Sequence, residues 1–215
     1  MNELFEAISR GDAAKVQSIL DRDPAQISST ENNTTPLLMA LYCGQKHVAD
    51  VLAGRGARIG FPEACAMGDL DRVRSMAEKD LSLIDTRSPD GFPPLGLAIF
   101  FRHPQIAKLL IERGADVNSV STNKQHVAPV HAAAAVGDVA MMKLLLERGA
   151  NANAKQESDY TPLHEAAGRG NTEMAQLLLA HGADLHAKAS DGSTPADTAV
   201  KRGQPAFAEW IRTVT

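Results

Sequence analysis

Cysteine and aromatic residues are both scarce in this 215-residue chain. Aromatic side chains make up 4% of it, and Cys43 and Cys65 are the two cysteines. We interpret the two thiols as small core residues rather than a disulfide, which indicates a reducing compartment and a cytoplasmic protein. The longest apolar run, near 95–101, is too short to span a bilayer, and the opening residues 1–12 lack a basic leader followed by an apolar run. We therefore expect neither membrane association nor a secretory signal.

Charges of both signs are spread along the chain. There are 22 Lys and Arg against 26 Asp and Glu, which gives a formal net charge of -4. Because no basic face is evident, we expect neither a nucleic acid nor another anionic partner. The sequence has no glycine-rich phosphate loop, nucleophile elbow or HExxH motif. His181 and His186 have no ligand cluster at metal spacing, so we predict no metal, no cofactor and no enzymatic activity.

The stretch 159–187 shows how the chain is built. Thr161 and Pro162 are typical of a helix start, because the hydroxyl can accept from an unpaired amide and the missing N–H of proline costs nothing there. The pattern predicts a first helix from Pro162 to a turn at Gly170 and a second helix that ends at Gly182. Helices this short are unstable alone, so they need neighbours that bury their apolar stripes.

The same pattern recurs along the chain. The helix-start prolines Pro129, Pro162 and Pro195 and the turn glycines Gly137, Gly170 and Gly203 are each spaced by 33 residues. A fixed period of this length predicts stacked units that share a continuous core.

The residues of the repeat resemble the ankyrin family. Thr161-Pro162-Leu163-His164, Gly170 and Gly182-Ala183-Asp184 match its repeat pattern almost position by position. The resemblance implies an all-α ankyrin repeat solenoid of about seven helix-turn-helix units with short projecting hairpin loops. It covers 1–215 as a single domain, with capping units at about 1–31 and 191–215. It also implies a monomer that binds a protein partner through its concave face. The alternative is a small-molecule-binding or regulatory subunit associated with an enzyme.

Three places depart from the period. Gly44 and Gly68 are nine residues closer together than the period requires, so we expect the projecting hairpin to be truncated within 57–69. Residues 23–27 replace the usual Gly-Ala ending of a unit, and we predict an extended turn there. Arg102 stands where neighbouring units have the turn glycine. Either that turn differs, or a left-handed arginine is strained by about 1 kcal/mol.

Three polar residues have a structural as well as a functional interpretation. His131 and His164 recur at one repeat position, and in ankyrin-like repeats that histidine hydrogen-bonds the backbone of the adjoining loop. Asp116-Val117-Asn118 resembles the pattern in which animal ankyrin proteins are hydroxylated on the hairpin asparagine. The simpler interpretation is that Asn118 hydrogen-bonds across its own turn.

Several of the aromatic residues occupy positions that face the concave side in the family. Alignment on the Thr-Pro pairs places Phe92 and Tyr160 at loop tips, and Tyr42, Phe100 and Phe101 on first helices. Exposed aromatic rings often form interface hot spots. Phe100 and Phe101 point about 100° apart, so one of them can pack between units. The predicted partner-binding residues are Tyr42, Phe92, Phe100, Phe101, Arg102, Tyr160 and Arg169, with the two arginines as polar rim.

Overall fold

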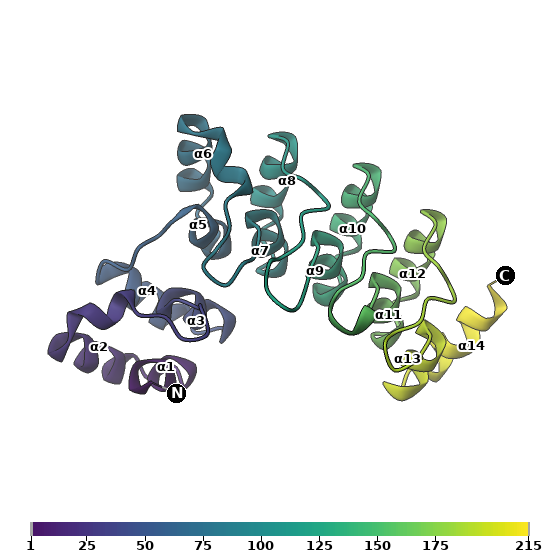
Figure 1. The fold of residues 1–215 in the computed structure, drawn as a ribbon, viewed down its shortest axis with the longest axis horizontal. Helices are drawn as coiled ribbons and strands as arrows, with labels where there is room; N and C mark the ends of the chain where they lie inside the picture. Colours follow the sequence, from purple (N-terminus) through teal and green to yellow (C-terminus); the bar gives the residue numbers. More distant parts are fainter. Residues whose placement is uncertain (1, 215) are drawn as a thin grey trace. The chain divides into compact units, whose positions relative to one another are not determined.

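A computed structural model describes residues 2–214, and these residues form 14 α-helices in seven consecutive pairs (Figure 1). The predicted all-α repeat architecture is therefore confirmed. The chain divides into two compact units, unit 1 (1–94) and unit 2 (95–215). The single domain over 1–215 and its capping units stay predictions.

Unit 1 is built from three helix pairs. Its helices are α1 (Glu3–Ser9), α2 (Ala13–Arg22), α3 (Pro36–Tyr42), α4 (Lys46–Gly54), α5 (Phe61–Met67) and α6 (Leu70–Lys79). The first helices stack in order, α1 on α3 and α3 on α5, while α2 packs on α4. Leu4 and Ile8 of α1 share one buried cluster with Leu37 of α3 and Leu52 of α4. The core is therefore continuous from pair to pair. Each such side chain stabilises the fold by about 1.5–3 kcal/mol when it is buried away from water.

The exits of the first and third pairs are helical. The predicted extended turn at 23–27 is wrong, because Pro24–Ser28 form a 3-10 helix, η1. Asp23 accepts a hydrogen bond from the N–H of Ala25 at 3.2 Å, and Pro24 supplies the fixed φ of a first helical position. The third pair ends in the same way in η2 (Leu81–Asp85), where Asp80 caps Ser82.

The hairpin between the second and third pairs is truncated, as predicted. Only residues 55–60 separate α4 from α5. The other two loops of unit 1 close as hairpins, through the backbone pairs Glu31–Thr34 and Ser88–Phe92. Unit 1 thus carries two projecting loops and one direct connection.

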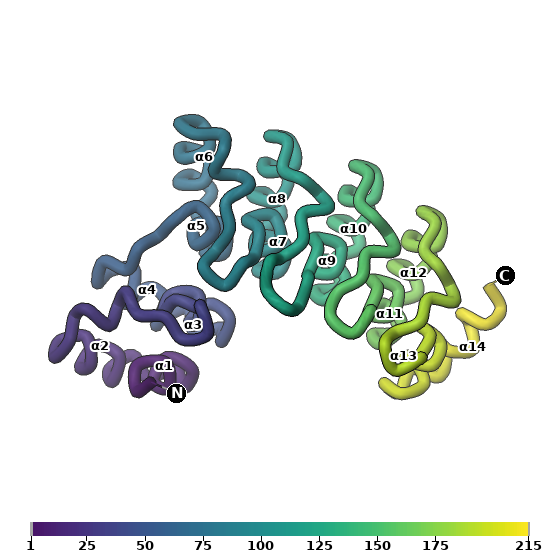
Figure 2. The backbone as a smooth tube through the Cα atoms, in the orientation of Figure 1, coloured from purple at the N-terminus to yellow at the C-terminus, as the bar shows by residue number. Residues whose placement is uncertain are grey.

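Unit 2 continues the pattern with four helix pairs, the first of which begins at the last residue of unit 1. Its helices are α7 (Pro94–Phe100), α8 (Pro104–Glu112), α9 (Pro129–Val136), α10 (Val139–Glu147), α11 (Pro162–Gly168), α12 (Thr172–Ala180), α13 (Pro195–Lys201) and α14 (Pro205–Thr213). We call α7, α9, α11 and α13 the first-helix row, and α8, α10, α12 and α14 the second-helix row. Figure 2 shows the connecting loops running beside the first-helix row.

The period of the sequence sets the helix starts and turns of unit 2. Pro129, Pro162 and Pro195 begin α9, α11 and α13, and Gly137, Gly170 and Gly203 have φ of +70°, +65° and +72°. Glycine adopts this left-handed conformation without steric cost, so each turn can end one helix and begin the next.

Hydrogen bonds join the turns of successive pairs in unit 2. Asn118 donates to the carbonyl of Gly149 at 3.0 Å and accepts from the N–H of Asn151 at 2.8 Å. Asn118 also bonds across its own turn, as predicted, through its backbone N–H, which donates to Oδ1 of Asp116 at 2.8 Å. Both partners of its side chain belong to the next pair. Asn153 repeats the arrangement with Gly182 and Asp184, each at 2.7 Å. One amide side chain thus satisfies a backbone donor and a backbone acceptor of the neighbouring turn.

The two repeated histidines tie first helices to loops, as predicted. His131 accepts from the N–H of Ala128 at 3.0 Å, and its Nε2 lies 3.0 Å from the carbonyl oxygen of Ala154. His164 places Nε2 3.1 Å from the carbonyl oxygen of Ser193. Its Nδ1 lies 2.8 Å from the hydroxyl of Thr161.

Thr161 is the N-cap of α11, as predicted, and forms a capping box with His164. Burial disfavours the charged imidazole and lowers the pKa of His131 to about 4. Burial lowers the pKa of His164 as well.

The two cysteines are free, and they differ in environment. Cys65 is buried in α5, and burial raises the pKa of its thiol. Cys43 is exposed, so its predicted place in the core is wrong. The reason is its position as the C-cap of α3, beyond the buried stripe of that helix.

Candidate partner-binding surface

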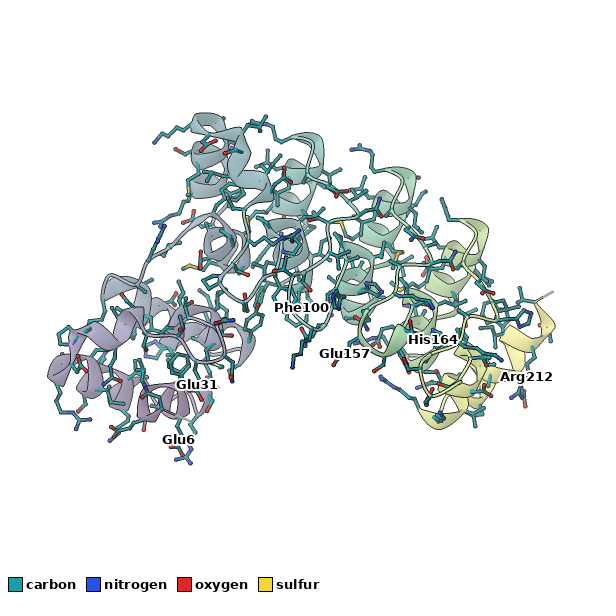
Figure 3. The ribbon with its side chains drawn as sticks, viewed as in Figure 1. Glu6, Glu31, Phe100, Glu157, His164 and Arg212 are labelled. Atoms are coloured by element: carbon teal, nitrogen blue, oxygen red, sulfur yellow. The ribbon has the colours of Figure 1, made fainter. Side chains whose placement is uncertain are left out.

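Phe100 is the exposed member of the phenylalanine pair. It ends α7 with 45% of its surface exposed, whereas Phe101 is half-buried. The two rings meet edge to face, with centroids 5.2 Å apart. Figure 3 shows Phe100 at the margin of the first helices. Phe101 therefore supports the ring that faces solvent.

Arg102 keeps the left-handed turn of its neighbours. Its φ is +61°, close to the values of the turn glycines. Its guanidinium donates to the carbonyl oxygen of Val136 at 2.6 Å, at the C-terminal end of α9. Of the two alternatives offered by the sequence, the strained left-handed arginine is the one observed.

Tyr160 lies against two first helices. It is half-buried, and its ring lies 4.9 Å from the ring of His164 on α11. Its hydroxyl lies 3.4 Å from Oγ1 of Thr198 on α13. The ring is therefore partly committed to packing, and only its remaining surface is open to a partner.

Arg169 belongs to a cluster of three charged side chains. Its Nε lies 2.9 Å from Oε1 of Glu165, and Nη1 of Arg202 lies 3.9 Å from Oε2 of the same carboxylate. Glu165 and Arg202 were not predicted as site residues. The spacing of Arg169 and Arg202, one period apart, was the signal in the sequence that could have identified Arg202.

Tyr42 and Phe92 come together in unit 1. The Tyr42 hydroxyl donates to Oδ2 of Asp90 at 2.8 Å, and the Tyr42 and Phe92 ring centroids are 6.3 Å apart. Both residues are half-buried. Burial, reinforced by the Asp90 charge, raises the pKa of the Tyr42 phenol. Burial also raises the pKa of Glu63 on α5, which is nearly inaccessible to solvent.

The structure thus places the predicted partner-binding residues in separate groups rather than in one cluster. Tyr42 and Phe92 form one contact in unit 1. In unit 2, Phe100, Phe101 and Arg102 are consecutive. Tyr160 and Arg169 flank α11.

A small cavity of about 280 Å³ lies in the second-helix row between α8 and α10. Its lining residues include Lys108, Asp138, Met141, Lys143 and Glu147. Three of these polar groups are engaged within the protein: the Asp138 side chain accepts from the N–H of Met141, and Lys143 pairs with Glu147. The cavity is at the lower limit of volume for small-molecule sites.

Among residues 2–214, no group of His, Cys, Asp and Glu side chains is placed to hold a metal ion. No helix in the described part of the chain has the length and apolar character needed to cross a membrane.

The stacked helix pairs and their joined turns define a helical repeat protein. Comparison with known families identifies which one. Ankyrin repeats in three copies match residues 130–213, and a single ankyrin repeat matches residues 90–122. Together these matches cover more than half of the chain, and the chain belongs to the ankyrin repeat family.

Individual relatives resemble the chain over limited regions. The transient receptor potential cation channel subfamily A member 1 of Drosophila melanogaster is 29% identical over 136 residues, which are 56% of this chain and 11% of that protein. An ankyrin repeat protein of Rickettsia felis is 27% identical over 165 residues, 72% of this chain and 61% of that protein. The Saccharomyces cerevisiae protein named "Probable 26S proteasome regulatory subunit p28" is 25% identical over 163 residues, 69% of this chain and 71% of that protein. The chain thus spans less than two thirds of the first two relatives.

Proposed function

We propose that the chain binds a protein partner through its first helices and hairpin loops, and that it acts by binding rather than by catalysis. Ankyrin repeats are generally protein interaction modules. A stacked array presents a long preformed surface, so a partner pays little for ordering it. The family's general role therefore agrees with the architecture.

The observation that carries the proposal is the exposure of Phe100. Aromatic residues are 4% of the chain, yet this ring has 45% of its surface exposed beside a second phenylalanine. A large apolar ring in water contributes little to stability, whereas burying it against a partner can supply a binding hot spot. Phe101 gives the anchor a fixed support. Arg102 and Arg169 supply a polar rim.

The half-buried aromatics have a secondary part in the proposal. Tyr42 and Phe92 in unit 1, and Tyr160 in unit 2, are each half-buried and each contact another ring. Replacing them would disturb both binding and folding. Phe100 is therefore the residue at which the two effects separate best.

The test compares capture of proteins from the native cell by the wild-type chain and by Phe100→Ala, with identification by mass spectrometry. Leu81→Ala is the matched control, because Leu81 is an exposed apolar side chain on η2 with 52% of its surface accessible. We expect Phe100→Ala to lose a specific partner while its melting temperature stays within a few degrees of wild type. Equal capture by all three proteins would contradict the proposal.

The alternative of a small-molecule or regulatory subunit has less support. The cavity between α8 and α10 is small, and Asp138, Lys143 and Glu147 in its lining are engaged within the protein. The monomeric state and the cytoplasmic location stay predictions.

A further inference from the structure

Two arginines at the C-terminal ends of neighbouring first helices share one carboxylate. Glu165 lies between Arg169, at 2.9 Å, and Arg202, at 3.9 Å. The Glu165 side chain is only 16% exposed, whereas those of Arg169 and Arg202 are 44% and 52% exposed. The cluster therefore holds its negative charge inside and presents two guanidinium groups to solvent. Its formal charge is one positive unit.

Gly168 positions the second arginine. It is buried in α11, and a Cβ at this residue would come within 3.0 Å of Cδ and 3.3 Å of Nε of Arg202. The missing side chain at residue 168 therefore leaves room for the stem of Arg202 against α11. Glu165 and Gly168 together favour the arrangement in which both arginines lie beside one carboxylate.

Charges of both signs surround this cluster. The first-helix segments of unit 2, including their turns, contain four cationic side chains against three acidic ones. The cationic residues are Arg102, Arg169, Lys201 and Arg202, and the acidic residues are Asp138, Glu165 and Asp197. Lys201 also pairs with Asp191 at 2.7 Å, so the positive charge beside Glu165 is that of Arg169 and Arg202. Total charge averages over surfaces that the fold separates, so the net charge of -4 does not by itself exclude a local site for an anionic group.

The positive cluster shares its helix row with the exposed aromatic ring. Phe100 ends α7, and Arg102 beside it reaches the end of α9 by its hydrogen bond to Val136. Further along the same row, α9 packs on α11, and α11 packs on α13. Neighbouring packed helices are about 8–10 Å apart, so a peptide in extended conformation can reach from Phe100 to Arg202 with about ten residues.

We propose that the first-helix row of unit 2 binds an acidic, extended segment of a partner protein, with carboxylates at Arg169 and Arg202 and an apolar side chain at Phe100. The inference deepens the proposed function and rests on it. A carboxylate is the matching ligand because guanidinium presents paired N–H donors in one plane. A partner carboxylate would continue the alternation of charge that Glu165 begins.

Cations near the C-terminal ends of helices also stabilise the helix dipole, which accounts for their presence on α11 and α13 but not for their arrangement. Helix stabilisation does not require two arginines on different helices to share a carboxylate, or Gly168 to receive the stem of Arg202. A nucleic acid would use the same charges. Because a base can also stack on an exposed aromatic ring, the experiment below includes a single-stranded oligonucleotide.

The test selects peptides from a random 12-residue phage library on the immobilised full-length chain. Selected peptides are synthesised, and their affinities are measured by fluorescence anisotropy for wild type, the double variant Arg169→Gln/Arg202→Gln, and the single variant Arg202→Gln. The single variant keeps the Arg169–Glu165 pair in case the double variant folds poorly. The matched control is Lys143→Gln/Arg148→Gln, which removes two exposed charges from α10 and its C-cap in the second-helix row.

We expect the selected peptides to combine several Asp or Glu residues with at least one large apolar residue. The double variant should weaken binding by about tenfold and the single variant by about threefold, while the control changes it by less than twofold. Phe100→Ala should weaken the same peptides.

Three results would overturn the inference. These are the absence of any binding peptide, peptides without acidic enrichment, and acidic peptides that bind the double variant as well as wild type. Neutral or basic peptides that lose affinity only in Phe100→Ala would refute the acidic class and leave the proposed function standing. A single-stranded DNA oligonucleotide that binds, with the same loss in the double variant and no competition by peptide, would assign the charges to nucleic acid instead.

Discussion

Arg102 donates a hydrogen bond of 2.6 Å to the carbonyl oxygen of Val136 while its own backbone has φ of +61°. The residue that replaces a turn glycine therefore carries backbone strain and a compensating contact. The left-handed conformation costs a non-glycine residue about 1 kcal/mol, and one exposed hydrogen bond returns about 0.5–1 kcal/mol. The two effects nearly cancel.

This balance gives the first prediction. The sequence alone predicts that Arg102→Gly stabilises the protein by about 1 kcal/mol, but loss of the Val136 contact offsets part of that gain. We expect Arg102→Gly to unfold within about 0.5 kcal/mol of wild type. Arg102→Ala keeps the strain without the contact and should be less stable than Arg102→Gly by about 1 kcal/mol. Urea unfolding of the three proteins measures both differences, and an alanine variant as stable as the glycine variant would show that the turn is unstrained.

Acid should destabilise the protein through its buried histidines. His131 has its pKa lowered by burial to about 4, from an ordinary value of 6.5. Above the unfolded pKa the imidazole is neutral in both states, so no penalty arises. As the pH falls from 6.5 towards 4, the imidazole becomes protonated in the unfolded state but stays neutral in the folded state. The free energy of unfolding therefore falls by up to about 3 kcal/mol. Burial lowers the pKa of His164 too, and it adds to the loss in the same direction.

Urea unfolding at pH 7.5, 6.0 and 5.0 checks this prediction. The loss of unfolding free energy between the first and last pH should be smaller in His131→Gln than in wild type. His47→Gln serves as the control, because His47 is exposed on α4. A variant lacking His131 that keeps the full pH dependence would assign the acid sensitivity to other groups.

The amide bridges between turns should contribute to stability. Asn153→Ala removes a hydrogen bond to Gly182 and another from Asp184, both 2.7 Å long. Because these backbone groups lie near solvent, we expect a loss of about 1–2 kcal/mol rather than the larger cost of a buried orphan group. Asn153→Asp retains an oxygen acceptor for Asp184 and should lose less than alanine. Thermal unfolding that ranks the two variants in the opposite order would contradict the assignment of these contacts.

Local opening should differ along the chain. Residues 55–60 connect two helix pairs without a hairpin, whereas Leu178 is fully buried in α12 within the regular part of the repeat. Regions with fewer contacts open at lower free energy. Hydrogen exchange followed by mass spectrometry should therefore find faster exchange at Val51 to Phe61, and at the turn around Arg102, than at Leu177 to Leu179. The prediction is wrong if the amides of the short connection exchange as slowly as those of α12, or more slowly.

The repeat itself could be predicted because its signals are local. Pro129 and Gly137 act through their own φ angles, so their positions in the sequence are sufficient to place a helix start and a turn. The place of Arg102 in the period left two alternatives open, a different turn or a left-handed arginine, and the structure has the second. Its hydrogen bond to Val136 could not be predicted, because that depends on where the next helix ends.

The site was less predictable because the exposure of a side chain depends on how neighbouring helix pairs pack. Adjacent Phe100 and Phe101 are equivalent in the sequence pattern, and only the packing around the end of α7 decides which ring remains in solvent. Cys43 appeared to belong to a core stripe, but it lies beyond the last helical turn. Glu165 is a common helix-surface residue, and nothing in its own segment indicates that Arg202, on another helix, shares its carboxylate.

The asparagine bridges bear on how such a gene can gain or lose length. Asn151 and Asp184 are one period apart and occupy the same place in successive turns, so excision of residues 151–183 would present the backbone N–H of Asp184 to Asn118 in place of that of Asn151. Gly149 would still accept from the same amide. A deletion or duplication of 33 codons at this point therefore keeps both hydrogen bonds of the Asn118 side chain, one to Gly149 and one from the residue at the position of Asn151. A deletion of any other length would place a residue from a different part of the repeat at that position. The hydrogen bonds between turns therefore favour changes of length by whole repeats.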